Sequence, residues 1–110
     1  MPSFIKDEEV EHALHWLVDN ATTAAQARAE RGYVEDYSSV LKARIMKEHP
    51  SLSGIAQERE ALADPRYLQH LEAIRQAVVE DEKMRWLKGA AEAKIEAWRT
   101  CAATERAMKL

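Results

Sequence analysis

The feature that most constrains this chain is a stretch of about forty residues that contains almost no helix breaker. Asp64 can cap the free amides of a helix, and Pro65 then takes the first helical position, where its missing N–H costs nothing. From Arg66 to about Arg106 only Gly89 interrupts the stretch. The spacing predicts one helix about 60 Å long, because an α-helix rises ~1.5 Å per residue.

Apolar residues recur along this stretch at intervals of three and four, which is the spacing of one face of a helix. They fall into two stripes, and we expect both to face inward. The first stripe is Leu68, Leu71, Ile74 and Val78, and the second is Met84, Leu87, Ala91, Ile95, Trp98 and Ala102.

A second long helix is expected in the first half of the chain, starting near Phe4–Asp7. Its end is fixed at His49, because Pro50 disfavours helical geometry in the residue before it. The expected apolar positions are Val10, Leu14, Leu17, Ala21, Tyr33, Tyr37, Val40, Leu41 and Ile45.

Residues 19–22 leave two alternatives open for this first helix. Asn20 is a candidate C-terminal residue, and Thr23 with Gln26 is a candidate capping box, so the helix could break there. The alanine-rich stretch 21–29 favours an unbroken helix, because alanine is the best helix former. We therefore predict one long helix, with the break as the alternative.

Residues 51–63 are predicted to form a short connecting helix. Ser51 or Ser53 would cap it, and Ile55, Leu62 and Ala56 would face inward. Two long helices of similar length joined by a short one predict an all-α fold. The architecture is a long antiparallel helical hairpin of coiled-coil character, forming a single domain over residues 1–110.

A hairpin folded about residue 57 predicts which residues lie opposite one another. Trp16 would lie near Trp98, and Ala24 near Ala90. At mid-height, arginines on the first helix would meet acids on the last one and form a polar waist; its predicted members are Arg28, Arg31, Glu80, Asp81 and Glu82. The alternative is that both groups point to water, where such pairs contribute only about 0–1 kcal/mol.

Large apolar side chains spread around more than one face of the two helices, which is wider than a lone hairpin covers. A self-associating four-helix bundle, and therefore a homodimer, would bury the remainder. The side chains concerned are Trp86, Leu87, Met84, Tyr33, Tyr37 and Val34.

Charge and composition narrow the function classes. The 16 basic and 19 acidic residues give a net charge of −3, which argues against a general nucleic-acid coat. The single cysteine excludes an intramolecular disulfide framework and fits a reducing cytoplasm. No apolar run reaches the roughly 18 residues of a membrane span.

No motif predicts an enzyme or a cofactor. The chain has no P-loop, nucleophile elbow, dinucleotide fingerprint or paired-cysteine zinc spacing. Glu9 and His12, with His15 one turn on, have the Glu-x-x-His spacing of di-iron bundles, but the second half of such a site is missing. We therefore predict no metal site, and Cys101 is predicted to be a small buried side chain rather than a nucleophile.

Residues 83–110 hold seven basic and three acidic residues, and this basic C-terminal end supports an alternative function. Basic side chains could neutralise phosphates while Trp86 stacks on an unpaired base of single-stranded DNA. Against this, Glu92 and Glu96 lie among the basic residues. The residues predicted for this role are Arg85, Trp86, Lys88, Arg99 and Arg106.

Three segments, 56–60, 63–67 and 90–100, resemble a family of small helical proteins from bacteriophages and prophages. The most distinctive piece is Ile-Glu-x-Trp-Arg at 95–99, and the similarity covers most of residues 33–106. The resemblance implies a phage context and the cytoplasm of a bacterial host, and it assigns no catalytic residue. We expect a non-enzymatic interaction protein that binds a protein partner or itself, and that has no membrane association. The alternative is an accessory protein of single-stranded-DNA binding or recombination.

Overall fold

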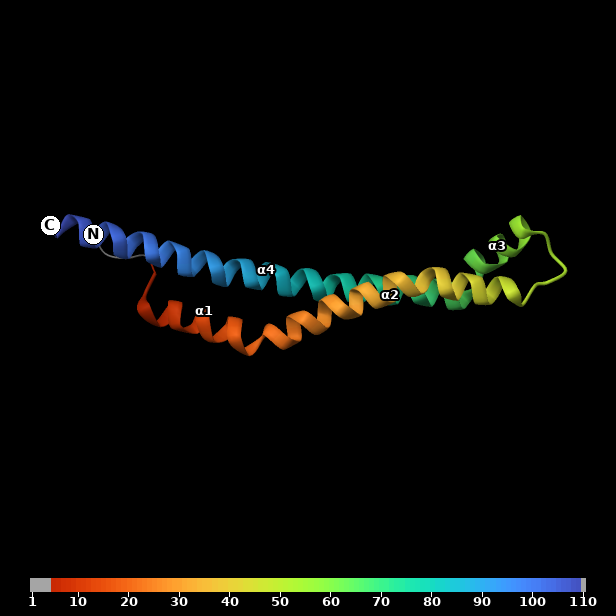
Figure 1. Ribbon diagram of the computed structural model, residues 1–110, viewed down its shortest axis with the longest axis horizontal. Coiled ribbons are helices and arrows are strands. Elements are labelled where there is room, and N and C mark those ends of the chain that lie inside the picture. Colours follow the sequence, from red (N-terminus) through yellow and green to blue (C-terminus); the bar gives the residue numbers. More distant parts are fainter. Residues whose placement is uncertain (1–4, 110) are drawn as a thin grey trace. The chain divides into compact units, whose positions relative to one another are not determined.

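The computed structural model describes residues 5–109, and in this range the chain is all-α and without strands (Figure 1). Four helices follow one another: α1 (Asp7–Asp19), α2 (Ala21–Lys47), α3 (Gly54–Ala63) and α4 (Pro65–Met108). The predicted fold class is confirmed. The 44 residues of α4 make it the longest helix, as the absence of breakers predicts.

Contacts divide the chain into two units, which are described separately. Unit 1 comprises residues 1–25 and 82–110 and holds α1 with the C-terminal part of α4. Unit 2 comprises residues 26–81 and holds most of α2, all of α3 and the N-terminal part of α4. The expectation that residues 1–110 behave as one folding domain stays a prediction.

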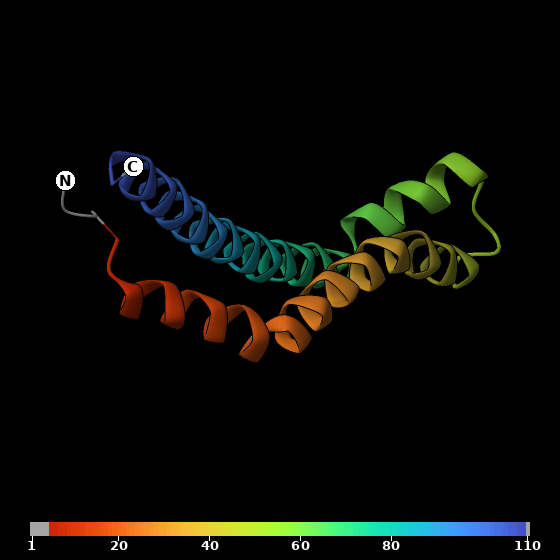
Figure 2. The ribbon, with the colours of Figure 1, turned by 60° about the vertical axis from the view of Figure 1, so that its left-hand side comes forward.

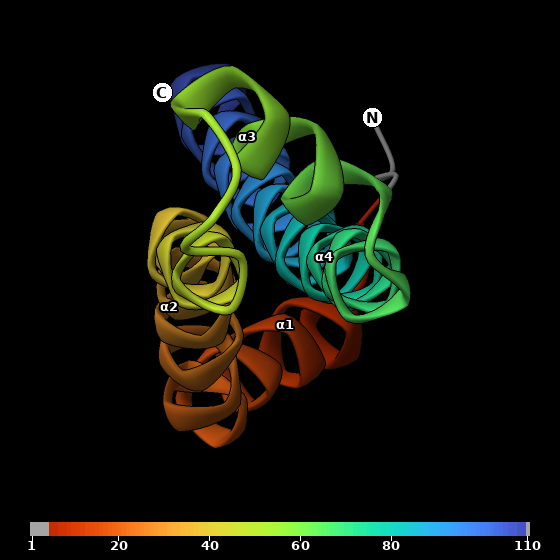
Figure 3. The same ribbon diagram turned by 90° about the vertical axis from the view of Figure 1, so that its right-hand side faces the viewer.

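Unit 2 is an antiparallel helical hairpin closed by the short helix α3 (Figure 3). Arg31 of α2 reaches Asp81 of α4 at 3.2 Å, and seven residues later Ser38 reaches His70 at 3.0 Å. Because the position on α4 falls as the position on α2 rises, the two helices run in opposite directions. This is the hairpin with a short connecting helix that the sequence predicts.

In unit 1, α1 runs antiparallel to the C-terminal part of α4 (Figure 2). The indole N–H of Trp98 donates to Asp7 Oδ1 at 2.8 Å, and Trp16 shares a surface hollow with Ala90 and Lys94. The predicted pairing of Trp16 with Trp98 is therefore wrong. Helical spacing does not fix the longitudinal register between two helices, and the register of α1 against α4 differs from the predicted one by about two turns.

The first long helix is broken, so the unbroken helix that we predicted is wrong and the alternative break is present. α1 ends at Asp19, and α2 begins at Ala21. Asn20 lies between them, and both its backbone N–H and its side-chain amide donate to the Trp16 carbonyl, at 2.9 and 3.0 Å. Asparagine competes with helical backbone bonds in this way, and here it outweighs the high helix propensity of the alanines that follow.

The connecting helix has the predicted caps at both of its junctions. Ser53 Oγ accepts from the Ala56 N–H at 3.3 Å at the start of α3. Asp64 Oδ1 accepts from the Arg66 N–H at 2.8 Å at the start of α4, whose first residue is Pro65.

The inward face of α3 is not the predicted one. Ile55 is 71% exposed and Leu62 is 45% exposed, whereas Ala61 is fully buried and Ala56 is half-buried. The fully buried residue of α3 is therefore the small Ala61, whereas the larger side chains of Ile55 and Leu62 stay exposed to solvent.

Burial along α4 recurs every seven residues, the period of a coiled-coil seam. The seam positions are His70, Ala77, Met84, Ala91, Trp98 and Glu105, all buried or half-buried. The second predicted stripe therefore faces inward except at Leu87, which is exposed. In the first stripe, Ile74 and Val78 are half-buried, but Leu68 and Leu71 are exposed, because three- and four-residue spacing fits a broader face than the seam covers.

Candidate interaction surface on α4

Trp86 is the most exposed large apolar side chain of unit 1 among the described residues, at 78%. It follows the buried Met84 by two residues, which is a rotation of about 200° around the helix, so the indole lies on the side of α4 away from the seam. An open hollow of about 490 Å³ adjoins it, lined also by Glu82, Arg85, Gly89 and Ala90.

Small side chains continue the same side of α4 after Trp86. Ala90, Ala93 and Ala97 follow it at intervals of four, three and four residues, and all of them are exposed. These intervals match those of a packing seam, and at Ala90 the row borders the hollow that Trp16 of α1 also lines. We call Trp86, Ala90, Ala93 and Ala97 the Trp86 face.

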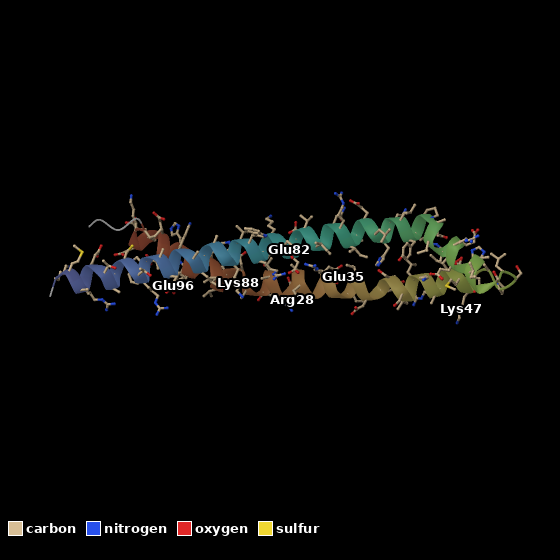
Figure 4. The ribbon with its side chains drawn as sticks, turned by 90° about the horizontal axis from the view of Figure 1, so that it is seen from above. Arg28, Glu35, Lys47, Glu82, Lys88 and Glu96 are labelled. Carbon is tan, nitrogen blue, oxygen red and sulfur yellow. The ribbon has the colours of Figure 1, made fainter. Side chains whose placement is uncertain are left out.

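The basic residues predicted to contact phosphate lie on α4, but most of them pair with acids of the same helix. Arg85 lies 3.2 Å from Glu82, Lys88 lies 3.8 Å from Glu92, and Arg99 lies 3.4 Å from Glu96. Glu82, Lys88 and Glu96 are labelled on this helix in Figure 4. Pairing one to one with carboxylates leaves this side of the helix with little excess positive charge.

The predicted nucleic-acid site also divides between two sides of the helix. Residues 85, 88, 99 and 106 fall within about 60° of one another on a regular helix, whereas residue 86 is about 100° or more away from them. Arg99, Arg106 and Lys109 line a separate hollow of about 650 Å³ at the end of α4, beside Trp98. The structure therefore does not bring Trp86 together with the basic side chains named with it.

The acids and arginines of the predicted polar waist are only partly brought together. Arg31 Nη1 lies 3.2 Å from Asp81, which is buried, and Arg31 Nε lies 3.0 Å from Glu35. Arg28 and Glu80 are exposed, and the side chain of Arg28 is labelled on α2 in Figure 4. A buried carboxylate in a seam favours one register over its neighbours, because a slip would leave it unpaired.

An aromatic cluster in unit 2 was not anticipated from the sequence. The rings of Tyr33 and Tyr37 stack with centroids 6.1 Å apart, and the imidazole of His70 meets Tyr37 edge-on at 5.6 Å. Ser38 Oγ lies 3.0 Å from His70 Nε2, and Arg44 lies over the Tyr37 ring. The i, i+4 spacing of the tyrosines was the available signal, but their contact with His70 depends on the register of the hairpin.

The remaining candidate residues do not come together as a metal site in the part of the chain that the structure describes. In residues 5–109, no group of three His, Cys, Asp or Glu side chains is arranged to hold a metal ion, so Glu9, His12 and His15 form none. Cys101 is a free, half-buried thiol rather than a fully buried one.

Two arginines of unit 2, Arg66 and Arg75, shift the pKa of the carboxyl groups that they pair with. Hydrogen bonds from Arg66 lower the pKa of the Asp64 carboxyl, and Asp64 and Glu48 together raise the pKa of Arg66. A hydrogen bond from Arg75 likewise lowers the pKa of Glu72. These shifts come from structural pairs at the surface, and none of them marks a general acid or base.

No family model, no curated protein sequence and no solved structure matches this chain. In the part of the chain that the structure describes, none of the helices has both the length and the apolar character needed to cross a lipid bilayer.

Proposed function

We propose that this protein is a non-enzymatic interaction protein that binds a protein partner through the Trp86 face of α4. The observation that carries the proposal is the 78% exposure of Trp86 on the side of α4 away from its seam. Exposed apolar surface often marks a binding site, and tryptophan is enriched among the few residues on which binding energy concentrates.

The setting we propose for this activity is the cytoplasm of a bacterium that carries the phage or prophage. It rests on the resemblance of residues 56–60, 63–67 and 90–100 to small helical phage proteins, and on the use of a single cysteine.

The proposal is tested by photo-crosslinking in bacterial cells that produce the full chain. A photoreactive amino acid at position 86 is expected to form a covalent adduct with a protein. The matched control places it at Glu60, an exposed position on α3. No adduct at position 86, or adducts of equal yield at both positions, would contradict the proposal.

A second candidate function, binding of single-stranded DNA, is supported by the hollow at the end of α4. Three basic side chains and Trp98 line it, although Glu96 and Glu105 do so as well. Phosphate contacts strengthen as salt falls, so binding of labelled single-stranded DNA at ~50 mM salt tests this function directly. Binding that is lost in Arg99→Glu with Arg106→Glu, while circular dichroism is unchanged, would favour this candidate over the first.

A further inference from the structure

We infer that unit 1 has a binding site for a small aromatic carboxylate, in a hollow between α1 and the C-terminal part of α4. The hollow has a volume of about 210 Å³ and is lined by residues of both helices. The inference does not depend on the proposed function, because the ligand would contact Trp16 rather than Trp86.

The hollow exists because the seam side chains are small at this height. Ala13 of α1 and Ala91 of α4 are buried there, and Ala90 lines the hollow beside them. Trp16, which is half-buried, and Leu87, which is exposed, line it as well. Packed protein interiors leave few voids larger than a water molecule, and an apolar space of about 150 Å³ holds a benzene ring. This hollow therefore has room for one aromatic ring or two fused rings.

The indole of Trp16 favours an aromatic ligand over an aliphatic one. Aromatic rings attract one another in offset or edge-to-face arrangements, beyond what their buried area accounts for. Within residues 5–109, the Trp16 ring has no ring contact with another aromatic side chain. A ring bound in the hollow would supply that neighbour.

The polar side chains that line the hollow are both basic. They are Lys94 of α4 and His12 of α1, and no carboxylate of the described residues lines the hollow. The hollow beside Trp86 and the one at the end of α4 differ in this respect, because each of them includes at least one glutamate. The lining therefore selects a ligand that carries negative charge.

Lys94 is also available to pair with such a ligand. It forms no ion pair with any residue that the structure describes, whereas Lys88 on the same helix lies 3.8 Å from Glu92. The reason is local, because an acid three or four residues away is what pairs with a lysine on a helix. Those positions hold only apolar side chains here, namely Ala90, Ala91, Ala97 and Trp98. A ligand carboxylate can take the place of the missing acid while its ring enters the apolar part of the hollow.

The first test is a titration of the full-length chain with 1-naphthoate, followed by nuclear magnetic resonance. The indole N–H signals of Trp16, Trp86 and Trp98 report separately on their surroundings. We expect the Trp16 signal to shift and saturate with a dissociation constant of about 1 mM, the usual strength for a ligand of this size, and the other two to stay in place. A saturating shift at Trp86 or Trp98 instead, or no saturating shift at Trp16 up to about 10 mM, overturns the inference.

The second test separates the charge of the ligand from its shape, because 1-naphthamide has the shape of 1-naphthoate without the charge. Lys94→Gln should raise the dissociation constant of 1-naphthoate about three- to fivefold, as expected for an exposed ion pair, and leave that of 1-naphthamide unchanged. Lys88→Gln is the matched control and should change neither. Equal effects of Lys94→Gln on both ligands, or no effect on either, would overturn the assignment of the carboxylate to Lys94.

The third test fills the hollow. Ala90→Leu puts a larger side chain at an exposed lining position and should weaken binding of 1-naphthoate about tenfold or more. Ala93→Leu is the matched control, because Ala93 is also exposed on α4 but does not line the hollow, and it should leave binding unchanged. Circular dichroism checks that both variants stay helical. Binding of 1-naphthoate that survives Ala90→Leu places the ligand elsewhere and overturns the inference.

Discussion

The two units of this molecule bury their side chains to different depths. In unit 2, where α3 is added to the antiparallel pair, Ile45 and Ala61 are completely buried. In unit 1, which has no third helix, the most buried apolar side chains, Val10, Ala13, Met84 and Ala91, keep 6–7% exposure. Two helices alone leave an open edge beside every core residue, so the core of unit 1 depends on small side chains and close approach.

A series of matched isoleucine substitutions tests this difference most strongly. Ile45→Ala in unit 2 is expected to cost about 2–5 kcal/mol of unfolding free energy, because the side chain is fully buried and leaves a cavity. Ile95→Ala in unit 1 should cost less, since Ile95 is only half-buried. Ile55→Ala, at a 71% exposed position, should stay within about 0.5 kcal/mol. Chemical denaturation of the three variants measures their free energies of unfolding. If Ile45→Ala and Ile95→Ala lost the same amount of stability, the two units would not differ in how well they bury their core side chains.

The buried carboxylate of unit 2 gives the next largest effect. Arg31→Leu leaves Asp81 buried without this partner and should cost about 1–3 kcal/mol. Arg75→Leu removes an ion pair with Glu72 on the exposed side of α4 and serves as the control, with no resolvable change expected. Urea titration of both variants makes the comparison, and an Arg31→Leu protein as stable as the control would show that Asp81 is reached by water.

In unit 1 the corresponding long-range contact is the bond between Trp98 and Asp7. Trp98→Phe keeps a ring in the seam but removes the indole N–H, and it should cost about 0.5–1.5 kcal/mol. Native-state hydrogen exchange should show faster exchange in α1 and unchanged exchange in α3. If α3 exchanged faster as well, the two units would open together, and the comparison between them would have to be withdrawn.

The smallest expected effect is the pH dependence of the cap at Asp64. Its pKa is lowered in the folded chain by Arg66, so the stabilisation is present above the ordinary carboxyl range and is lost as pH falls through the lowered folded value. Asp64→Asn keeps a capping side chain but cannot titrate. The stability difference between the wild type and this variant should therefore shrink below about pH 4, where unfolded aspartate becomes protonated. Thermal melts at pH 7 and pH 3 measure the change, and a constant difference would contradict the assignment to Asp64.

Local features of the sequence predicted where α3 and α4 begin. Ser53 and Asp64 cap the helices that follow them, and Pro65 opens α4, because capping depends on groups within three residues. The break at Asn20 shows the limit of such reasoning. Asn20 favoured the end of a helix and the alanines after it favoured a continuous helix, and the prediction of a continuous helix was wrong.

The sequence by itself therefore determined that the chain is helical, where α4 begins and that its buried residues follow one side. The tertiary structure decided which residues face one another. In unit 1, a shift of about two turns placed Ala90 rather than Trp98 beside Trp16, and in unit 2 the packing of α2 against α4 brought His70 to Tyr37. The physical reason is that helical periodicity fixes the direction in which a side chain points around the axis of its helix. The longitudinal position of two helices depends instead on contacts between them, such as that of Arg31 with Asp81, and these contacts exist only after both helices have packed.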